Sequence, residues 1–310
     1  MQTVSVVVPF LNEGENLARF CEYIDGQANK AEYLMEVIFV DDGSSDDSVK
    51  VIESYDFKHC NAVKLIKFSK NFGSHAAVRA GFSKSTGDYC TYLDADLETP
   101  VDILDVMYKN IINDFDAVYI EKKSVSKSPV SKIASGIYSV LMRRFAVPGY
   151  RSGGINHMML NRKIVDYLND NMEHNSSLQL QIINAGFKSI IIGMDYRSRI
   201  CGKSKWTFSK KIKLFIDSFV SFSYLPIRMV SFIGFLLAFI GITYGIYLVI
   251  LRIIYDDLQQ GFATLSALLL FGFGLTNISL GIIAEYLWRT FDVSRNRPVF
   301  IISKEIQIKR

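Results

Sequence analysis

Residues 1–200 alternate between short apolar runs and segments in which apolar residues recur at helical spacing. The apolar runs, typical of strands because they are rich in β-branched and aromatic residues and end in polar turns, are Val4–Pro9, Glu36–Asp42, Val63–Phe68 and Tyr89–Leu93. Helical spacing occupies Glu15–Ile24, where Asn12 or Asn16 is available as a cap, and Ser74–Ser85. This alternation predicts an α/β fold with a mostly parallel sheet and helices on both faces.

The C-terminal part of the chain carries a different pattern. No charged residue occurs from Val230 to Leu251 or from Phe262 to Ala284. Each run exceeds the roughly 20 residues that a helix needs to cross a hydrocarbon core of ~30 Å. A buried soluble helix can also be apolar all round, but two such runs in tandem favour membrane spans. We therefore expect two transmembrane helices joined by a short segment, Arg252–Gly261.

The charges around these runs predict their orientation. Basic residues flank both outer ends of the pair, whereas the segment between the runs carries Asp256 and Asp257. The positive-inside rule then places both termini in the cytoplasm and this segment outside. Because Val4–Val8 begins a strand pattern without a basic and apolar leader, we expect no signal peptide. The expected location is the inner (cytoplasmic) membrane, with multi-pass topology.

These patterns predict four regions: a cytoplasmic α/β domain (1–206), a juxtamembrane amphipathic helix (207–228), two transmembrane helices (229–288) and a basic cytoplasmic tail (289–310). Lysines and large apolar residues mix over Thr207–Leu225, as in helices that lie in a membrane interface. Within the first region, the polar and basic segment Ser124–Ser135 predicts a mobile loop or a solvated connection. Apolar residues at helical spacing predict a helix over Ile133–Val147.

Composition excludes several classes of protein. The 310 residues include 35 Lys and Arg against 31 Asp and Glu, and this small, dispersed excess does not suggest a nucleic-acid-binding protein. Abundant aromatic and β-branched residues exclude a disordered chain. No C-x-x-C pair occurs among the cysteines, so we expect neither a zinc site nor a disulfide framework from Cys21, Cys60, Cys90 and Cys201. The mean hydropathy of +0.18 averages a polar domain with two apolar runs.

Polar residues cluster where the predicted strands end: Asn12-Glu13, Asp41-Asp42-Gly43-Ser44 and Asp94-Ala95-Asp96. In mostly parallel sheets, ligands bind outside the carboxyl ends of the strands. Two carboxylates on a short turn, as in Asp94-x-Asp96, suit Mg²⁺ or Mn²⁺, which takes one or two carboxylates together with substrate phosphates. Such pairs also occur in ordinary turns, and Asp41-Asp42 fits an Asx-type turn with Gly43 in a left-handed conformation.

The order of the motifs is more specific than any single motif. Val7–Glu13, Phe39–Ser44, Ser69–Gly73 and Leu93–Leu97 follow one another along the chain. This succession resembles the family 2, GT-A-type glycosyltransferases. With Arg199–Trp206 just upstream of the apolar runs, the chain is similar to the polyprenyl-phosphate hexose synthases, the group of bactoprenol glucosyltransferases and dolichyl-phosphate mannose synthases. The resemblance covers essentially the whole chain.

The resemblance implies that region 1–206 is a GT-A, Rossmann-like catalytic domain that binds a nucleotide sugar, UDP-hexose in our expectation. The residues that it implies in this binding are Pro9, Glu13, Asp42, Asn71 and Asp94. Asp94 and Asp96 would hold the Mg²⁺ or Mn²⁺ that bridges the donor diphosphate. A leaving nucleoside diphosphate gathers negative charge, which a metal ion and basic side chains stabilise.

The acceptor implied by the resemblance is a polyprenyl (undecaprenyl) phosphate lipid. Arg199, Ser204 and Lys205 would meet phosphate, from the donor or from this acceptor. The basic segment Arg199–Lys213 also fits a plain anchor for anionic lipids, and the two roles are compatible. The implied reaction is the inverting transfer of a hexose at the cytoplasmic membrane face. It gives a lipid-linked sugar for surface glycans, such as O-antigen, or for glycolipid modification.

Two positions depart from the pattern of the group. Glu98 lies in the run Leu97–Pro100, where the group usually has Gln or His and a D-P-P-like sequence. Asn156 stands where an Asp, proposed as a base or acceptor-site carboxylate, is common. Asn cannot take a proton, but an acceptor phosphate with a second pKa of ~6 to 7 is a dianion for much of the time at pH 7 and needs positioning more than deprotonation. His157 has no evident metal partner and is expected to be a structural, hydrogen-bonding histidine.

The implied catalytic residues are Asp96, Asn156, Arg199 and Lys205. Two other functions stay open. A processive polysaccharide synthase would carry a Gln-x-x-Arg-Trp motif and more spans, and neither is present. A membrane scaffold that binds a nucleotide sugar without turnover is consistent with Asn156, but the retained Asp and basic residues count against it. Gly241-x-x-x-Gly245 is typical of close helix packing within a subunit or in a homo-oligomer.

Overall fold

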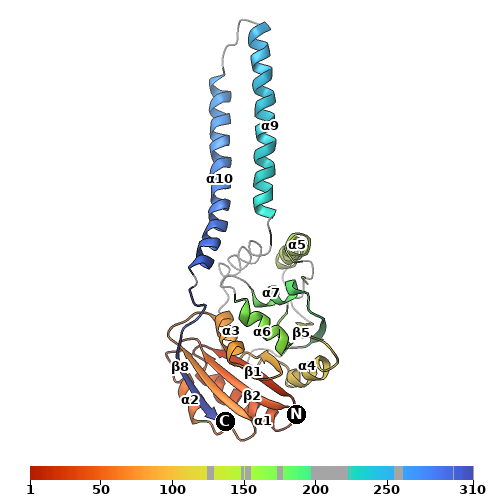
Figure 1. The fold of residues 1–310 in the computed structure, drawn as a ribbon, viewed down its shortest axis with the longest axis vertical. Coiled ribbons are helices and arrows are strands. Elements are labelled where there is room, and N and C mark those ends of the chain that lie inside the picture. Colours follow the sequence, from red (N-terminus) through yellow and green to blue (C-terminus); the bar gives the residue numbers. More distant parts are fainter. Residues whose placement is uncertain are drawn as a thin grey trace. The chain divides into compact units, whose positions relative to one another are not determined.

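The computed structural model of the chain describes residues 1–123, 129–147, 150, 155–172, 177–196, 223, 225–254, 261–295 and 297–309. Its strands are β1 (Thr3–Phe10), β2 (Leu34–Asp41), β3 (Ala62–Phe68), β4 (Tyr89–Tyr92), β5 (Ala117–Lys122), β6 (His157–Asn161), β7 (Ser189–Met194) and β8 (Ile302–Lys309). Its helices are α1 (Gly14–Ala28), α2 (Ser48–Ser54), α3 (Ser74–Lys84), α4 (Ile103–Ile111), α5 (Pro129–Phe145), α6 (Arg162–Asp170), α7 (Leu178–Ala185), α9 (Leu225–Ile254) and α10 (Phe262–Ser294) (Figure 1). The chain forms two compact units, Met1–Leu214 with Pro298–Arg310, and Phe215–Arg297.

The described strands of the first unit form one sheet in the order β7-β5-β6-β4-β1-β2-β3-β8. Strand β1 pairs in parallel with β2 and β4, β2 with β3, and β5 with β7, whereas β6 and β8 run antiparallel to their neighbours. The α/β fold with a mostly parallel sheet predicted from the sequence is therefore confirmed. Each strand predicted before residue 94 is found to within two residues at either end.

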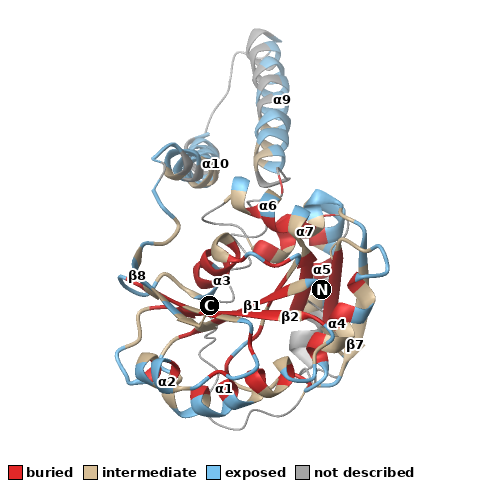
Figure 2. Cartoon of the chain, turned by 60° about the horizontal axis from the view of Figure 1, so that its bottom comes forward, coloured by how far each residue is buried: buried red, intermediate tan, exposed pale blue. Residues whose placement is uncertain are grey.

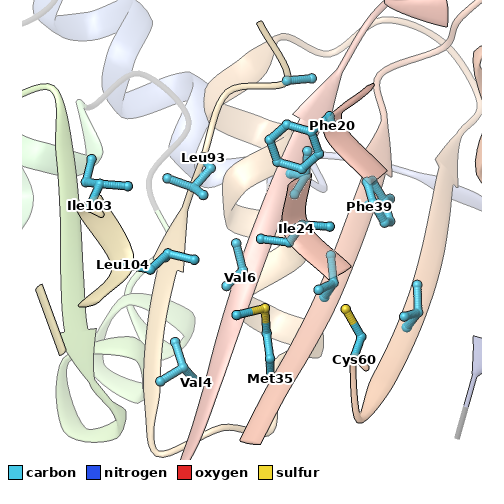
Figure 3. Packing of buried hydrophobic residues seen from close by; sticks show 14 of the residues in the cluster. Val4, Val6, Phe20, Ile24, Met35, Phe39, Cys60, Leu93, Ile103 and Leu104 are labelled. Carbon is cyan, nitrogen blue, oxygen red and sulfur yellow. The ribbon is translucent and has the colours of Figure 1, made fainter. Parts of the chain in front are cut away.

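Alternate side chains of the strands are buried under helices on opposite faces of the sheet. On one face, Val6 of β1 and Phe39 of β2 pack with Phe20 of α1 in a cluster that includes α2 and α4 (Figure 3). On the other face, the neighbouring Val7 and Ile38 belong to a cluster with α3, α6 and α7. Figure 2 shows the buried strands between these two layers. Because both faces are covered, the strands are apolar at consecutive positions.

Two local expectations were wrong. Neither Asn12 nor Asn16 caps α1: the N-cap is Glu13, which makes no side-chain cap, and Asn16 lies inside the first turn. Helix α5 begins at Pro129, so residues 129–135 are helical instead of a loop. Proline suits the first turn of a helix because its missing N–H has no partner there anyway. Residues 124–128 of the predicted loop lie outside the described residues.

The segment expected as a basic tail contributes a strand to the sheet. Strand β8 pairs antiparallel with β3, and Ile306 and Ile308 pack against the core. The partly buried Ile302 contacts the cluster on the other face. These apolar residues and the unpaired N–H and C=O groups of an edge strand explain why the segment joins the sheet. The expectation of a tail missed this pairing because it links residues far apart in the sequence.

The second unit contains the long helices α9 and α10. Large apolar side chains are exposed on both, including Phe232 and Phe235 of α9 and Phe271 and Phe273 of α10. Within this unit, the Tyr286 hydroxyl donates to the Ser223 carbonyl at 2.8 Å. Among the described residues, no helix combines the length and the apolar character that crossing a membrane requires. The two spans expected from the sequence stay a prediction, and most of the amphipathic segment Thr207–Leu225 lies outside the described residues.

Candidate active site

The predicted site residues gather at one edge of the sheet because of its topology. From β1 the chain moves to β2 and β3 on one side and then returns to β4 on the other side of β1. The carboxyl ends of β1 and β4 therefore flank a topological switch point, where α/β sheets bind ligands. Glu13 follows β1, and Asp94 and Asp96 follow β4. The start of the antiparallel β6, with His157, lies at the same edge.

Hydrogen bonds join the loops that follow β1 and β2. Asn12 has a left-handed φ of 52°, its N–H donates to the Ser44 hydroxyl at 3.0 Å, and its Oδ1 accepts from Ser45 N–H at 2.9 Å. The Glu13 N–H donates to the Ser48 hydroxyl at 3.0 Å. The Asn12-Glu13 motif is thus held against the Asp41–Ser44 turn, as two walls of one site.

Asp42 joins the same turn to the loop that follows β3. Only 4% of Asp42 is exposed, and its carboxylate accepts Phe72 N–H at 2.7 Å and Gly73 N–H at 3.0 Å. Burial raises the pKa of Asp42, with a further rise from the neighbouring Asp41 carboxylate and an opposing effect of the two N–H groups. The side chain predicted to bind the nucleotide therefore builds the wall of the site. A contact with a nucleotide stays a prediction.

Gly43 allows the two loops to approach each other. Its φ of 83° confirms the left-handed turn expected from the sequence. A Cβ at this position would lie 2.8 Å from the carbonyl carbon of Lys70 and 2.9 Å from the nitrogen of Asn71. Asn71 itself is exposed. The glycine thus brings Asn71, a predicted donor-binding residue, next to the Asp42 turn, while Pro9 lies half-buried near the end of β1.

The Asp94-x-Asp96 motif forms a tight turn beyond β4. The Asp94 side chain is 56% exposed, and Asp96 Oδ1 accepts Glu98 N–H at 3.2 Å. Leu97, between Asp96 and Glu98, has a left-handed φ of 57°. Among the described residues, no group of three or more His, Cys, Asp or Glu side chains is arranged to hold a metal ion. Two carboxylates still fit Mg²⁺ or Mn²⁺, because these ions keep the remaining positions for substrate phosphates and water.

His157 lies directly against this turn. It is 3% exposed, its Nε2 lies 3.6 Å from Asp94 Oδ2, and its Nδ1 lies 2.7 Å from the Tyr196 hydroxyl. Tyr196 and Tyr92 place their rings 5.7 and 5.4 Å from the imidazole. The expectation that His157 is buried in a hydrogen bond is confirmed, and the structure adds its position beside Asp94.

Asn156, the departure from the family pattern, lies exposed just before β6. Its N–H donates to the Ile120 carbonyl at 2.9 Å, and its carbonyl accepts the Tyr92 hydroxyl at 2.8 Å. The Gln179 amide donates to the preceding carbonyl of Ile155 at 2.7 Å. The backbone of Asn156 is therefore fixed on both sides, at the same edge as the Asp94-x-Asp96 turn.

Sequence reasoning missed two residues of the site, Tyr196 and Lys122. Lys122 ends β5, Tyr196 follows β7, and the Lys122 ammonium lies 5.3 Å from the centre of the Tyr196 ring. Strands β5 and β7 are parallel neighbours, so both residues reach the carboxyl edge. A prediction of β5 and β7 from their apolar runs, Ala117–Ile120 and Ser189–Met194, would have placed them there. The remaining predicted residues, Arg199, Ser204 and Lys205, lie outside the described residues.

Comparison with known proteins assigns the family. Residues 5–171 match the model of Glycosyl transferase family 2. The chain is 29% identical, over 99% of its own length and 95% of the relative's, to the undecaprenyl-phosphate 4-deoxy-4-formamido-L-arabinose transferase of Proteus mirabilis (strain HI4320). The putative glycosyltransferase CsbB of Bacillus subtilis (strain 168) is 30% identical, over 97% of this chain and 91% of that protein. A solved structure, mannosyl-3-phosphoglycerate synthase from Rubrobacter xylanophilus, shares 14% identity and a TM-score of 0.47, covering 70% of this chain and 71% of that one. The family match spans more than half of the chain, so this protein belongs to glycosyl transferase family 2 and is a glycosyltransferase.

Proposed function

We propose that this glycosyltransferase moves a hexose from a UDP-linked sugar to polyprenyl phosphate, undecaprenyl phosphate in bacteria, with inversion at the anomeric carbon. The observation that carries the proposal is the Asp94-x-Asp96 turn at the switch point of the sheet, opposite the Asn12-Glu13 loop. The undecaprenyl-phosphate 4-deoxy-4-formamido-L-arabinose transferase of Proteus mirabilis, which aligns over 99% of this chain, supports the choice of acceptor. The lipid-linked product would serve surface glycans or glycolipids.

The donor would lie along the carboxyl edge of the sheet. Glu13 and Asn71, on loops fixed around the Asp42 turn, would contact the nucleotide, and Pro9 would line its pocket. Asp94 and Asp96 would hold Mg²⁺ or Mn²⁺ against the diphosphate. When bound, the metal ion supplies positive charge where the leaving nucleoside diphosphate gathers negative charge.

The acceptor phosphate would approach from the side of Asn156. Its dianion is already nucleophilic near pH 7, so this edge has to position the phosphate and does not need a proton acceptor. Asn156, with its backbone fixed by Ile120 and Tyr92, offers an amide for that purpose. The basic side chains Arg199 and Lys205, with Ser204, would neutralise and orient phosphate.

A lipid acceptor places the enzyme at the cytoplasmic face of the inner membrane in this proposal. Two observations support the location: the uncharged runs Val230–Leu251 and Phe262–Ala284, and the exposed apolar side chains of α9 and α10. Exposed apolar surface of this extent is typical of a membrane or protein contact. The proposed topology keeps both termini in the cytoplasm.

The proposal is tested with full-length protein in detergent or nanodiscs. It is incubated with undecaprenyl phosphate, Mn²⁺ and a panel of labelled nucleotide sugars, and lipid-linked product is counted after extraction. We expect one UDP-hexose to give product and Asp96→Ala to abolish it. The matched control is Asp102→Ala, because Asp102 is exposed near the same edge and makes no side-chain cap on α4.

Three results would contradict the proposal. One is the absence of product with every donor, and another is undiminished product from Asp96→Ala. Metal-dependent donor binding without transfer would favour the non-catalytic scaffold, whereas products carrying many sugars would favour a processive synthase.

A further inference from the structure

The His157 side chain at the site has a buried polar atom, Nε2, without a hydrogen-bond partner among the described residues. His157 Nε2 is inaccessible to solvent and makes no hydrogen bond with the described residues. The carboxylate oxygen Oδ2 of Asp94 lies 3.6 Å from Nε2. Buried polar atoms in native proteins nearly always have a partner, so one that lacks it calls for an explanation.

The rest of the imidazole is held firmly. The rings of Tyr92 and Tyr196 lie 5.4 and 5.7 Å from its ring centre, and its Nδ1 is 2.7 Å from the Tyr196 hydroxyl. If the Tyr196 O–H donates to Nδ1, the proton of the neutral imidazole resides on Nε2, because the bond made by one ring nitrogen sets the state of the other. An N–H group then faces the Asp94 carboxylate.

We propose that His157 is a positioning residue for Asp94, an inference that rests on the proposed function. Its Nε2–H would close on Oδ2 when Asp94 binds the divalent cation, and so turn the other carboxylate oxygen toward the ion. The 3.6 Å separation is slightly longer than a hydrogen bond and shortens to one with a small rotation of the exposed carboxylate. Partners that orient a ligating carboxylate in this way typically change metal affinity by about 10- to 100-fold when removed.

A purely structural histidine would explain the burial and the ring stacking, so the test has to separate the two nitrogens. In full-length protein with UDP present, Mn²⁺ affinity is measured by electron paramagnetic resonance for His157→Gln and His157→Asn. The Gln amide reaches the position of Nε2, facing Asp94, whereas the Asn amide reaches that of Nδ1, facing Tyr196. We expect Asn to weaken Mn²⁺ binding roughly tenfold or more and Gln to keep most of the affinity.

Tyrosine variants provide a milder test that preserves every ring. Tyr196→Phe removes the hydroxyl on Nδ1 and is expected to weaken Mn²⁺ binding. Its matched control is Tyr119→Phe, which removes another buried tyrosine hydroxyl, on β5, from a cluster on the other face. Melting temperatures confirm that each variant is folded.

The inference is overturned if Gln and Asn weaken Mn²⁺ binding equally, if neither weakens it, or if the wild type binds no Mn²⁺. The lipid acceptor is absent from this measurement. A wild type that shows the expected order of variants and yet transfers no sugar to polyprenyl phosphate supports the role of His157 and overturns the proposed function.

Discussion

Two carboxylate pairs at the same edge of the sheet are used in opposite ways. Asp41 and Asp42, at the end of β2, are 0% and 4% exposed, and the oxygens of Asp42 accept backbone N–H groups from the loop after β3. Asp94, beyond β4, has a side chain that is 56% exposed. In the sheet, only β1 lies between β2 and β4. Both pairs consist of aspartates that follow a strand, so their different exposure comes from the segments that cover them.

The topology explains that difference. Strand β2 has the parallel strands β1 and β3 on its two sides, so the loops that follow both strands lie beside its turn and cover it. Strand β4 lies at the switch point, with antiparallel β6 as its other neighbour. Its turn is thus left accessible, as expected for the place where an α/β sheet binds its ligand. One pair of carboxylates is buried between loops, and in the other pair the Asp94 side chain is mostly exposed.

In the comparison of Asp94 with Asp42, the largest expected effect is that of Asp94→Ala on catalysis. We expect the rate of sugar transfer to fall about 10²- to 10³-fold, or roughly 3–4 kcal/mol, as when one group that stabilises developing charge is removed. The melting temperature should stay at the wild-type value because the side chain is mostly exposed. Transfer to undecaprenyl phosphate and thermal unfolding measure the two effects. A fall in melting temperature comparable with that of Asp42→Ala would contradict the distinction between the two pairs.

The part of this site that the sequence predicts is local in origin. Each Asp motif follows a short strand pattern, rich in β-branched residues before Asp41 and in aromatic residues before Asp94, so strand, turn and carboxylates are encoded within about ten neighbouring positions. The sequence did not show that Asp42 is buried, because its partners Phe72 and Gly73 belong to another loop. Burial of a turn depends on which strands are neighbours, and a single local pattern carries no information on that.

The second expected effect is on stability. Asp42→Ala leaves the N–H groups of Phe72 and Gly73 without their acceptor and should destabilise the fold by about 3 kcal/mol. Asp42→Asn, which keeps one acceptor oxygen, should cost less. Urea denaturation followed by circular dichroism measures both. If Asp42→Ala unfolds at the wild-type urea concentration but loses donor binding, Asp42 acts on the nucleotide and not on the loop.

A smaller effect is expected from Gly43→Ala. Alanine at a φ of 83° is strained, and its Cβ would lie 2.8 Å from the Lys70 backbone, so the loop carrying Asn71 must shift. We expect a loss of about 2 kcal/mol in stability and a raised KM for the donor, with kcat changed less. Gly26→Ala in α1 is the matched control, because a Cβ there meets no atom within 4 Å. A donor KM equal to that of the control would show that the loop does not contact the nucleotide.

The partners of His157 and of β8 could not be predicted from the sequence. The partner of His157, Tyr196, lies 39 positions away, and β8 pairs with β3 across more than 230 positions. Neither pairing follows from a period or a motif, because each depends on the strand order of the completed sheet. The residue type indicated only that His157 would have a polar partner, because a buried imidazole at the start of an apolar strand needs one.

The smallest expected effect is a difference in the pH dependence of stability between two buried carboxylates. The pKa of Asp42 is raised, chiefly by burial. Burial also acts to raise the pKa of Asp25, but the N–H groups of Lys58, His59 and Cys60 outweigh it, so that pKa is lowered. Both carboxylates accept backbone N–H groups, so they form a matched pair with shifts of opposite sign.

The signs follow from proton linkage. The folded state binds the proton of Asp42 more tightly than the unfolded chain, so wild type should gain stability relative to Asp42→Asn as the pH falls through the folded pKa toward about 3.9. The contribution of Asp25 is present above about 3.9 and is lost as the pH falls through its folded pKa, so wild type should lose stability relative to Asp25→Asn. Urea titrations of the three proteins between neutral and acidic pH measure both trends. If the stability differences of the two Asn variants from wild type change in the same direction with pH, burial does not dominate the pKa of Asp42. The contrast between Asp42 and Asp94 then rests on their exposed fractions alone.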